Sequence, residues 1–416
     1  MQCALFFLLT CVLTLGACSD DPISEPGTPS LGVVEVRADE PVKIRSLLAH
    51  TIAPSIGVSQ RHGVELAVRD ISRIHGYAIE LGEPVDGTCG PDGGRAGAEQ
   101  IAADPQVIGV IGTSCSGAAV AASPVLSEAG LVMVSPSNTS PRLTSDLAGN
   151  AGPDYHPGYY RVDDNDLYQG QAVADFAYRE LELKRMATVD DGDPYTTALV
   201  SAFGDAFRVL GGDVTAVTQI QKGDTDMTEV LAAIAATDPD GIFFPLFEVE
   251  GSPFTEQARG FDGLEDATLI TGSALLISAF LGQPHSAGVY GAGPVADLGA
   301  NINAFTGKSA GEVLAAYEAT YGESPASTYW AHAYDATTLL LSAIESVAVV
   351  EDGKLSVDRA ALREELSATA GFQGLLGTLA CDDFGDCGTG RVNIYHHTDS
   401  SVTDPAQLPV VYQFAP

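Results

Sequence analysis

A short turn rich in hydroxyl groups and glycine is the first place where this chain could do chemistry. Residues 112–117 (GTSCSG) follow the apolar run Val107–Ile111 and precede a segment with helical spacing. Backbone N–H groups at a helix N-terminus, aided by hydroxyl donors, hold a carboxylate well, so Ser116 and Gly117 predict an anion site. Two alternatives stay open, a helix cap without a ligand and the nucleophile elbow of a hydrolase. The elbow motif G-x-S-x-G requires a Gly where Ser116 stands.

The first residues of the chain have the pattern of an export signal. An uncharged apolar run ends in Leu15-Gly16-Ala17-Cys18, and it is too short to span a bilayer stably. Small residues before a cysteine resemble the bacterial lipobox, in which the cysteine is acylated and becomes the new N-terminus. We therefore expect residues 1–17 to be a signal peptide and residues 18–40 to hold lipidated Cys18 and a flexible tether. An ordinary cleaved signal that happens to end in Cys18 is the alternative.

The remaining cysteines predict disulfides. Cys3 and Cys11 lie in the signal, and an even set of four follows Cys18: Cys89, Cys115, Cys381 and Cys387. In an oxidising compartment four cysteines allow three pairings. A local bridge between Cys381 and Cys387 would close a turn-like loop and leave Cys89 with Cys115. A zinc site is the alternative, although the spacings lack CxxC pairs and no His stands beside them.

The net charge of the chain limits the classes of partner that it can bind. The net charge of −35 belongs entirely to the part after residue 18. Such a charge argues against nucleic acid as a partner, because nucleic-acid binding needs a basic face. It also argues against docking of the protein surface on anionic lipid. A solubility adaptation is one explanation, and an acidic site for a cationic ligand is the other.

Short apolar strands alternate with amphipathic helices, which predicts an α/β fold with mostly parallel sheets. The part after residue 17 is too long for one compact core, so we expect two domains. Two series of strands and helices, over residues 42–134 and 167–271, look like two similar lobes. The second series includes an expected helix over Leu167–Leu183 and another opened by a capping box at Asp226–Glu229. Further long helices are expected over Ala310–Tyr321 and Tyr329–Val347.

Several segments resemble those of a known family. Residues 109–117 look like a strand–turn–helix binding loop, and Leu131–Thr144 (LVMVSPSNTSPRLT) resembles the segment I-S-P-x-x-T-x-P-x-L-T. Tyr160–Gly170 resembles F-R-x-x-x-x-D-x-x-Q-G, and residues 223–226 and Gly371–Leu379 fit later stretches. From about Val42 onward the chain therefore resembles the type I periplasmic binding proteins. The most similar group is the branched-chain amino-acid (leucine/isoleucine/valine) binding family of ABC transporters.

The resemblance implies two Rossmann-like lobes that are joined by three crossover segments and have a ligand cleft between them. Crossings near Tyr160, Val289 and Phe372 would put residues 41–159 and 289–371 in the N-terminal lobe. Residues 160–288 and 372–416 would form the C-terminal lobe. In this family a disulfide commonly joins the segment before the first binding loop to the loop itself, which matches Cys89 and Cys115.

In the N-terminal lobe the resemblance implies a carboxylate site. Ser116, beside Gly117, and Thr139 would hold the carboxylate of an α-amino acid, and the main chain of Ser137 and Asn138 would face the ligand. The alternative is that Ser116 only caps a helix and Thr139 only fills a turn.

In the C-terminal lobe the resemblance implies aromatic contacts. Tyr195 matches an aromatic residue whose ring could cover the ligand, although Thr196 stands where the family usually has Gly. Phe247 stands near the position of a further family Tyr. The ligand site would therefore lose a hydroxyl there and gain an apolar wall. A buried core aromatic is the alternative for Phe247.

The main departure from the family pattern is at Ser273. Amino-acid binders of this family place an acidic residue near this position to pair with the ligand ammonium. A buried ammonium without a counter-charge is costly. Either Glu248 or Glu250 takes over that role, or the ligand lacks an ammonium, as an amide, a urea-like compound or a plain carboxylic acid does.

The implied function is that of an extracytoplasmic solute-binding lipoprotein of an ABC importer. It would bind an amino acid or a related small polar solute in a cleft that closes on the ligand. We expect a monomer that is lipid-anchored to a bacterial membrane, works with a permease and an ATPase, and has no catalytic residues, cofactor or metal. A ligand-sensing lobe for a membrane signalling partner and an exported hydrolase are the alternatives.

Overall fold

The computed structural model describes residues 31–416, which form one compact unit. The expected signal peptide, the lipidation site Cys18 and most of the expected tether lie outside the described residues. Within residues 31–416, no helix is both long enough and apolar enough to cross a membrane.

The N-terminal lobe is built on a seven-stranded sheet of order β3-β4-β2-β6-β7-β8, with β5 paired to β2. Strands β2, β6, β7 and β8 run parallel to one another, with β8 at the edge of the sheet. The strands are β2 Val42–Leu48, β3 Arg73–Ile74, β4 Tyr77–Glu80, β5 Val85–Asp86, β6 Val107–Gly112, β7 Val132–Ser135 and β8 Tyr159–Arg161. All six residues of β6 are buried, which explains why it reads as an uninterrupted apolar run.

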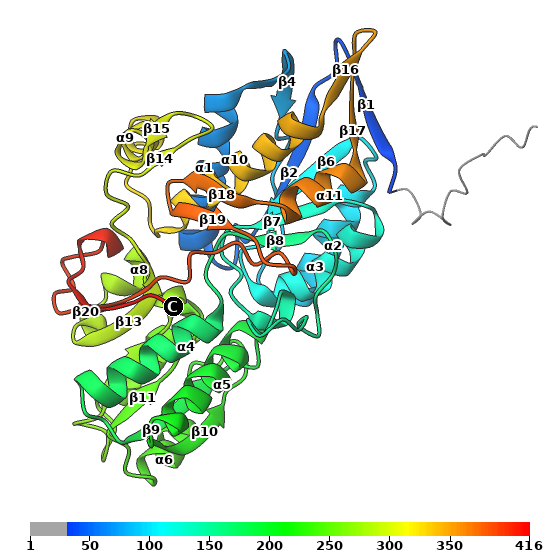
Figure 1. Ribbon diagram of the computed structural model, residues 1–416. Helices are drawn as coiled ribbons and strands as arrows, with labels where there is room; N and C mark the ends of the chain where they lie inside the picture. Colours follow the sequence, from blue (N-terminus) through cyan, green and yellow to red (C-terminus); the bar gives the residue numbers. More distant parts are fainter. Residues whose placement is uncertain (1–30) are drawn as a thin grey trace, which may run out of the picture. The chain divides into compact units, whose positions relative to one another are not determined.

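Helices cover both faces of this sheet (Figure 1). They are α1 Pro54–Ile71, α2 Pro91–Ala102, α3 Ser116–Glu128, α9 Ala310–Tyr321, α10 Tyr329–Val347 and α11 Arg359–Ser367. Val110 of β6 belongs to the core under α2 and α3, whereas its neighbour Ile111 belongs to the core under α1 and α10. Successive side chains of a strand point to opposite faces, so one strand supplies two cores.

The C-terminal lobe has a second seven-stranded sheet, of order β10-β9-β11-β12-β13-β20-β21. The strands are β9 Arg185–Asp190, β10 Asp213–Gln219, β11 Gly241–Phe243, β12 Thr268–Thr271, β13 Val289–Pro294, β20 Val392–His397 and β21 Val410–Phe414. The helices are α4 Asp166–Asp175, α5 Pro194–Val209, α6 Thr228–Ala235, α7 Glu248–Ala258 and the short α8 Ser278–Leu281. Separate cores lie under α4 and α5 and under α6 and α7, so this sheet is also covered on both faces.

Three connecting segments join the lobes. By sheet membership they are residues 162–165, 295–301 and 381–391. The first follows β8, close to the expected crossing at Tyr160. The second and third begin beyond the expected Val289 and Phe372, because β13 pairs with β12 and the hairpin of β18 (Ala370–Gly374) and β19 (Gly377–Ala380) precedes the third. The residue-level lobe boundaries stay predictions.

A three-stranded antiparallel sheet lies at the start of the described chain. Strand β1 (Val33–Arg37) pairs with β17 (Lys354–Asp358), which pairs with β16 (Val349–Glu351). Val34 and Val36 of β1 are buried, with 2% and 1% of their surface exposed. The expectation that the tether extends to residue 40 is therefore wrong, because this strand already belongs to the folded protein.

Most long periodic segments fold as predicted, and local details differ. The expected helices at residues 310–321 and 329–347 match α9 and α10. The expected helix over Leu167–Leu183 is present as far as Glu180, because a π-helical turn (Phe176–Glu180) follows α4, and it ends three residues earlier than expected. The expected capping box at Asp226 is wrong, since Met227 is the N-cap of α6 and Asp226 instead accepts a hydrogen bond from the Thr228 N–H.

Both expected disulfides are present in the structure. Cys89 is bonded to Cys115, and Cys381 is bonded to Cys387. These pairings leave no thiolate at any of the four positions, so the zinc alternative fails for them.

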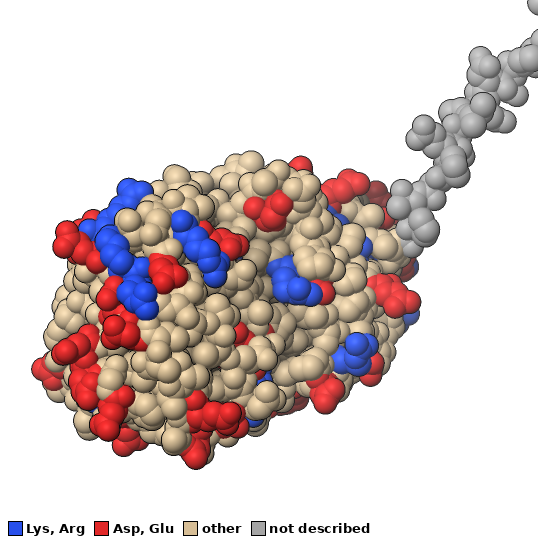
Figure 2. All heavy atoms as spheres, turned by 90° about the horizontal axis from the view of Figure 1, so that it is seen from below, with Lys and Arg blue, Asp and Glu red and all other residues tan. Residues whose placement is uncertain are grey.

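The acidic charge of the chain is distributed over its surface. On the face drawn in Figure 2, acidic side chains are scattered across the surface and the Lys and Arg side chains lie among them. Mixed charge of this kind fits a solubility role better than a nucleic-acid interface.

Candidate ligand-binding site

Six of the eight predicted site residues line one small compartment between the lobes. They are Ser116, Ser137 and Thr139 from the N-terminal lobe and Tyr195, Phe247 and Ser273 from the C-terminal lobe. The compartment has a volume of about 20 Å³, which is room for about one water molecule. Each of the six follows the carboxyl end of a parallel strand, where ligands bind in open α/β sheets.

The turn after β6 presents the start of α3 to this compartment. Ser116 is the first residue of α3, and the N-cap residue Cys115 makes no side-chain cap. The Ser116 hydroxyl accepts only a long hydrogen bond, 3.4 Å from the Ser140 N–H. The Ser116 hydroxyl is therefore available to a ligand, and the anion site at this helix N-terminus stays a prediction.

A buried hydrogen-bond chain fixes the orientation of Ser137. The Ser137 hydroxyl donates to the Ser114 carbonyl oxygen at 2.7 Å and accepts from the Gln60 amide at 2.6 Å. The Ser114 hydroxyl in turn donates to Gln60 Oε1 at 2.5 Å and accepts from the Ala49 N–H. Ser114, the serine of the elbow-like motif, is thus bound to an amide rather than to a histidine base, which disfavours the hydrolase alternative.

Two hydroxyl groups in the compartment have no well-aligned partner. Thr139 Oγ1 and the Tyr195 phenol oxygen are buried and make no hydrogen bond of good geometry within residues 31–416. Burial raises the pKa of the Tyr195 phenol, so it stays protonated and can donate. Thr139 lies beside the buried Asp166 carboxyl, and Tyr195 lies beside Ser273 and the Ala274 N–H, so a polar ligand would compete with these groups for the two hydroxyls.

The other two predicted residues, Asn138 and Gly117, lie beside the compartment without lining it. The Asn138 side chain points into the protein, where its Oδ1 accepts from Thr113 at 3.2 Å and from Tyr159 at 3.1 Å. At Gly117 a Cβ atom would come within 2.5 Å of Asp193 Oδ2 from the other lobe. A glycine is therefore required there for the close approach of the two lobes.

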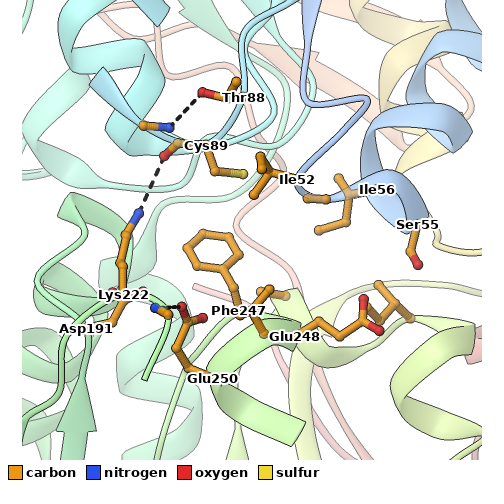
Figure 3. Close-up of a pocket in the computed structure, with 16 residues that line it drawn as sticks. Ile52, Ser55, Ile56, Thr88, Cys89, Asp191, Lys222, Phe247, Glu248 and Glu250 are labelled. Atoms are coloured by element: carbon orange, nitrogen blue, oxygen red, sulfur yellow. Dashed lines mark hydrogen bonds between the residues drawn. The ribbon is translucent and has the colours of Figure 1, made fainter. Parts of the chain in front are cut away.

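A second, larger cavity of about 360 Å³ adjoins the compartment (Figure 3). Ile56, Phe247 and Ala274 line both spaces. The Phe247 ring projects into the larger cavity, with Ile52 and Ile56 across from it. Its volume falls within the range of about 300–1,000 Å³ that is usual for small-molecule sites.

The larger cavity carries the acidic groups that position 273 lacks. Glu248 and Glu250 line it on two sides of Phe247, together with Asp191. Burial raises the pKa of the Glu248 carboxyl, and burial together with Asp191 raises the pKa of the Glu250 carboxyl. The expectation that one of these glutamates could replace the missing acid therefore remains open, and both lie farther along the cleft than Ser273.

One cation, Lys222, also lines the larger cavity. Its Nζ lies 2.5 Å from Asp193 Oδ2 and 3.5 Å from the Cys89 carbonyl oxygen, so it bridges the lobes. Asp193 in turn caps α5 by accepting from the Tyr195 N–H at 2.9 Å. This chain of contacts fixes the Tyr195 backbone against the N-terminal lobe.

Arg161 links the binding loop to the third connecting segment, residues 381–391. Its guanidinium donates to the Ser140 carbonyl oxygen at 2.8 Å and pairs with Asp386 at 2.6 Å. The Arg161 side chain is completely buried. Four acids near it are also buried, with at most 9% of their surface exposed: Asp163, Asp164, Asp166 and Asp386. Burial raises the pKa of Asp164 to about 7 and that of Asp166 to about 8. Burial also lowers the pKa of the neighbouring His332 to about 4, so it stays neutral.

The sequence missed several residues of the compartment. Tyr329 lines it from the first turn of α10, and Ile56 lines it from the first turn of α1. Both stand at the start of a helix, a position that suggests a cleft residue only when the topology is known. Ser114 and Ala274, also on the wall, adjoin residues that the sequence did single out.

Comparisons with known proteins agree with this geometry. The model of a periplasmic binding protein family matches residues 51–392. A Leu/Ile/Val-binding protein homologue of Brucella melitensis is 24% identical over 84% of this chain and 89% of its own length. An amino acid binding protein of Pseudomonas aeruginosa is 26% identical, but the match spans only 49% of this chain and 53% of that protein. The crystal structure of a leucine binding protein from Thermotoga maritima superposes with a TM-score of 0.76 at 25% identity, covering 90% of this chain and 99% of that one.

Proposed function

The chain belongs to the periplasmic binding protein family, and from this premise we propose that it is an exported solute receptor of an ABC importer. It binds an amino acid or a related small polar solute, such as an amide, a urea-like compound or a carboxylate, between its lobes. Relatives named as amino-acid and Leu/Ile/Val-binding proteins support this class of solute. The receptor itself performs no chemistry.

The convergence of six predicted residues from both lobes on one compartment supports the proposal most strongly. In the proposed complex the ligand carboxylate lies at the N-terminus of α3, with Ser116 and Thr139 as hydroxyl donors. Tyr195 approaches from the other lobe and donates from its phenol. Because its contacts come from both lobes, the ligand favours the closed arrangement over an open one.

Export and lipid anchoring rest on the sequence. We propose that Cys18 carries the lipid, that residues 19–30 act as a tether, and that the monomer presents the closed lobes to a permease and its ATPase. A ligand-sensing lobe for a membrane signalling partner would use the same site, and the two roles differ in the partner rather than in the ligand.

The test is ligand-dependent stability of the chain without residues 1–18. A solute at a hundred times its Kd should stabilise the folded state by about 2.7 kcal/mol. We expect a raised melting temperature with one class among amino acids, amides, urea and small carboxylates. Thr139→Val should abolish the shift, whereas Ser201→Ala, an exposed serine on α5, should retain it. A folded sample that responds to no class, or a Thr139→Val variant that responds normally, would contradict the proposal.

A further inference from the structure

The compartment and the larger cavity are adjacent spaces in the cleft. They share the walls of Ile56, Phe247 and Ala274, and Cys89 lines one and Cys115, its disulfide partner, lines the other. The compartment alone is too small for an amino acid. A solute whose carboxylate lies at Ser116 must therefore place the rest of its atoms in the larger cavity.

Much of the wall of the larger cavity is apolar. Ile52, Ile56, Phe247, Val249 and Ile277 contribute to it. Burying a CH₂ group against such a wall stabilises a complex by about 0.8 kcal/mol. The part of the solute nearest the carboxylate is thus expected to be a hydrocarbon chain.

Charge in the larger cavity is unbalanced. Three carboxylates line it (Asp191, Glu248 and Glu250), and the one cation on the wall, Lys222, is already paired with Asp193. Glu250 is also engaged, because its Oε1 accepts from the Gly223 N–H at 2.6 Å. The cavity therefore presents more negative charge than its own side chains neutralise.

Two of these carboxylates have oxygen atoms without a partner. Asp191 is 6% exposed, and its Oδ2 makes no hydrogen bond among the described residues, while its Oδ1 accepts from Thr196. Glu248 is half-buried beside Phe247 and has no hydrogen bond or ion pair to any described side chain. Carboxylates in such positions are normally paired, and a cation supplied by a ligand would complete them.

These observations locate the cationic group of the ligand. Ser273 is neutral, and the acids nearest the carboxylate site are Asp193, which pairs with Lys222, and the buried Asp166, whereas Glu248 is an unpaired carboxylate in the larger cavity. We propose that the solute is an elongated zwitterion, with a carboxylate at the α3 N-terminus and an amine or guanidinium group in the larger cavity against Glu248, which lies on the other side of Phe247 from Asp191 (Figure 3). This inference rests on the proposed function and narrows its ligand class.

The test compares probes that differ in one group at a time. ε-Aminohexanoate, hexanoate and L-leucine are titrated into the chain without residues 1–18 by calorimetry. We expect ε-aminohexanoate to bind at least about tenfold more tightly than hexanoate, the equivalent of about 1.4 kcal/mol. Leucine, whose ammonium adjoins its carboxylate, should bind more weakly than ε-aminohexanoate.

Matched variants assign the effect to the cavity. Glu248→Gln should remove the preference for ε-aminohexanoate over hexanoate and leave hexanoate binding unchanged. Glu256→Gln, on an exposed position of the same helix α7, makes the same charge change away from the cavity and should retain the preference. Because Glu248 makes no internal hydrogen bond, its substitution should not impair folding.

The outcomes separate this inference from the proposed function. If leucine binds and ε-aminohexanoate does not, or if both acids bind equally, the inference is overturned and the receptor function stands. An equal loss of all three probes in Glu248→Gln also overturns it, because that pattern indicates a general structural role. If no probe binds to the folded protein, the inference fails together with the proposed class of ligand.

Discussion

Replacing Arg161 should strongly destabilise this protein. The side chain is fully buried on β8 and joins three parts of the chain. It donates to the binding loop at Ser140, pairs with Asp386 in the third connecting segment, and its own backbone is bridged to residues 385–387. Arg161→Met retains much of the volume and removes the charge.

The magnitude follows from the charges that remain. Removing one partner of a buried ion pair costs about 3–5 kcal/mol, because the other charge is left uncompensated. Asp386 is the partner left uncompensated, because the raised pKa values of Asp164 (about 7) and Asp166 (about 8) leave those two acids largely or partly protonated at neutral pH. With an unfolding entropy of about 2.1 cal/mol/K per residue over residues 31–416, the melting temperature should fall by about 4–6 °C.

The assay is urea unfolding together with calorimetry on a double-mutant cycle. Arg161→Met and Asp386→Asn are measured singly and together. We expect Arg161→Met to cost more than Asp386→Asn, because Arg161 also donates to the Ser140 carbonyl oxygen and an asparagine keeps a hydrogen-bond acceptor at position 386. The double variant should cost clearly less than the two singles added together.

Two results would refute this reasoning. A loss below about 1 kcal/mol for Arg161→Met would show that the pair is no stronger than an exposed one. Strict additivity in the cycle would show that Arg161 and Asp386 do not stabilise each other. Either result would mean that the connecting segments are fixed by the backbone hydrogen bonds alone.

Three further predictions concern pH, the disulfides and the anchor. Burial raises the pKa of Asp166 to about 8, from about 3.9 in the unfolded chain. Because the folded state binds the proton more tightly, the free energy of unfolding should fall as pH rises from about 4 to 8. Asp166→Asn should flatten this part of the stability–pH profile; an unchanged profile would contradict it. Replacing both cysteines of the Cys89–Cys115 bridge by Ser should lower the free energy of unfolding by about 3.5 kcal/mol, because the bridged residues are separated by 26 positions. The same replacement at the Cys381–Cys387 bridge, with a separation of 6, should cost about 2 kcal/mol, and urea unfolding measures both. Cys18→Ala should move the expressed protein from the membrane fraction to the soluble one, unless Cys18 carries no lipid.

Elements with a strong local pattern could be predicted from the sequence. Helix α10 and strand β6 are examples, because an apolar period or an uninterrupted apolar run determines each of them directly. Strand β1 could not be recognised, since its partner β17 lies more than three hundred residues away and no local signal links them. Helix α7 was also missed, because Gly251 and Pro253 interrupt its helical pattern and their cost is offset by tertiary packing.

Part of the site could also be predicted from strong local sequence patterns. Residues that follow a recognisable strand, such as Ser116 after β6 and Thr139 after β7, could be placed at one edge of a sheet before the structure was known. The pairing of the two lobes, which brings Asp193 against Gly117 and Lys222 against the Cys89 carbonyl oxygen, depends on contacts that no local pattern records. The acidic cavity arises from that pairing and was foreseen only as an alternative for Glu248 and Glu250.

The two departures from the family pattern in the C-terminal lobe both affect the charge of the cleft. At position 196 a threonine replaces the usual glycine, and its hydroxyl donates to Asp191 Oδ1 at 2.6 Å. This bond orients the Asp191 carboxylate and leaves Oδ2 unbonded at the cavity. At position 273 a serine replaces the expected acid, so the acid that the family places there is missing, whereas Asp191 adds a carboxylate to the larger cavity. Thr196→Gly should therefore weaken binding of a long zwitterion and leave hexanoate binding unchanged, and equal weakening of both would contradict this account.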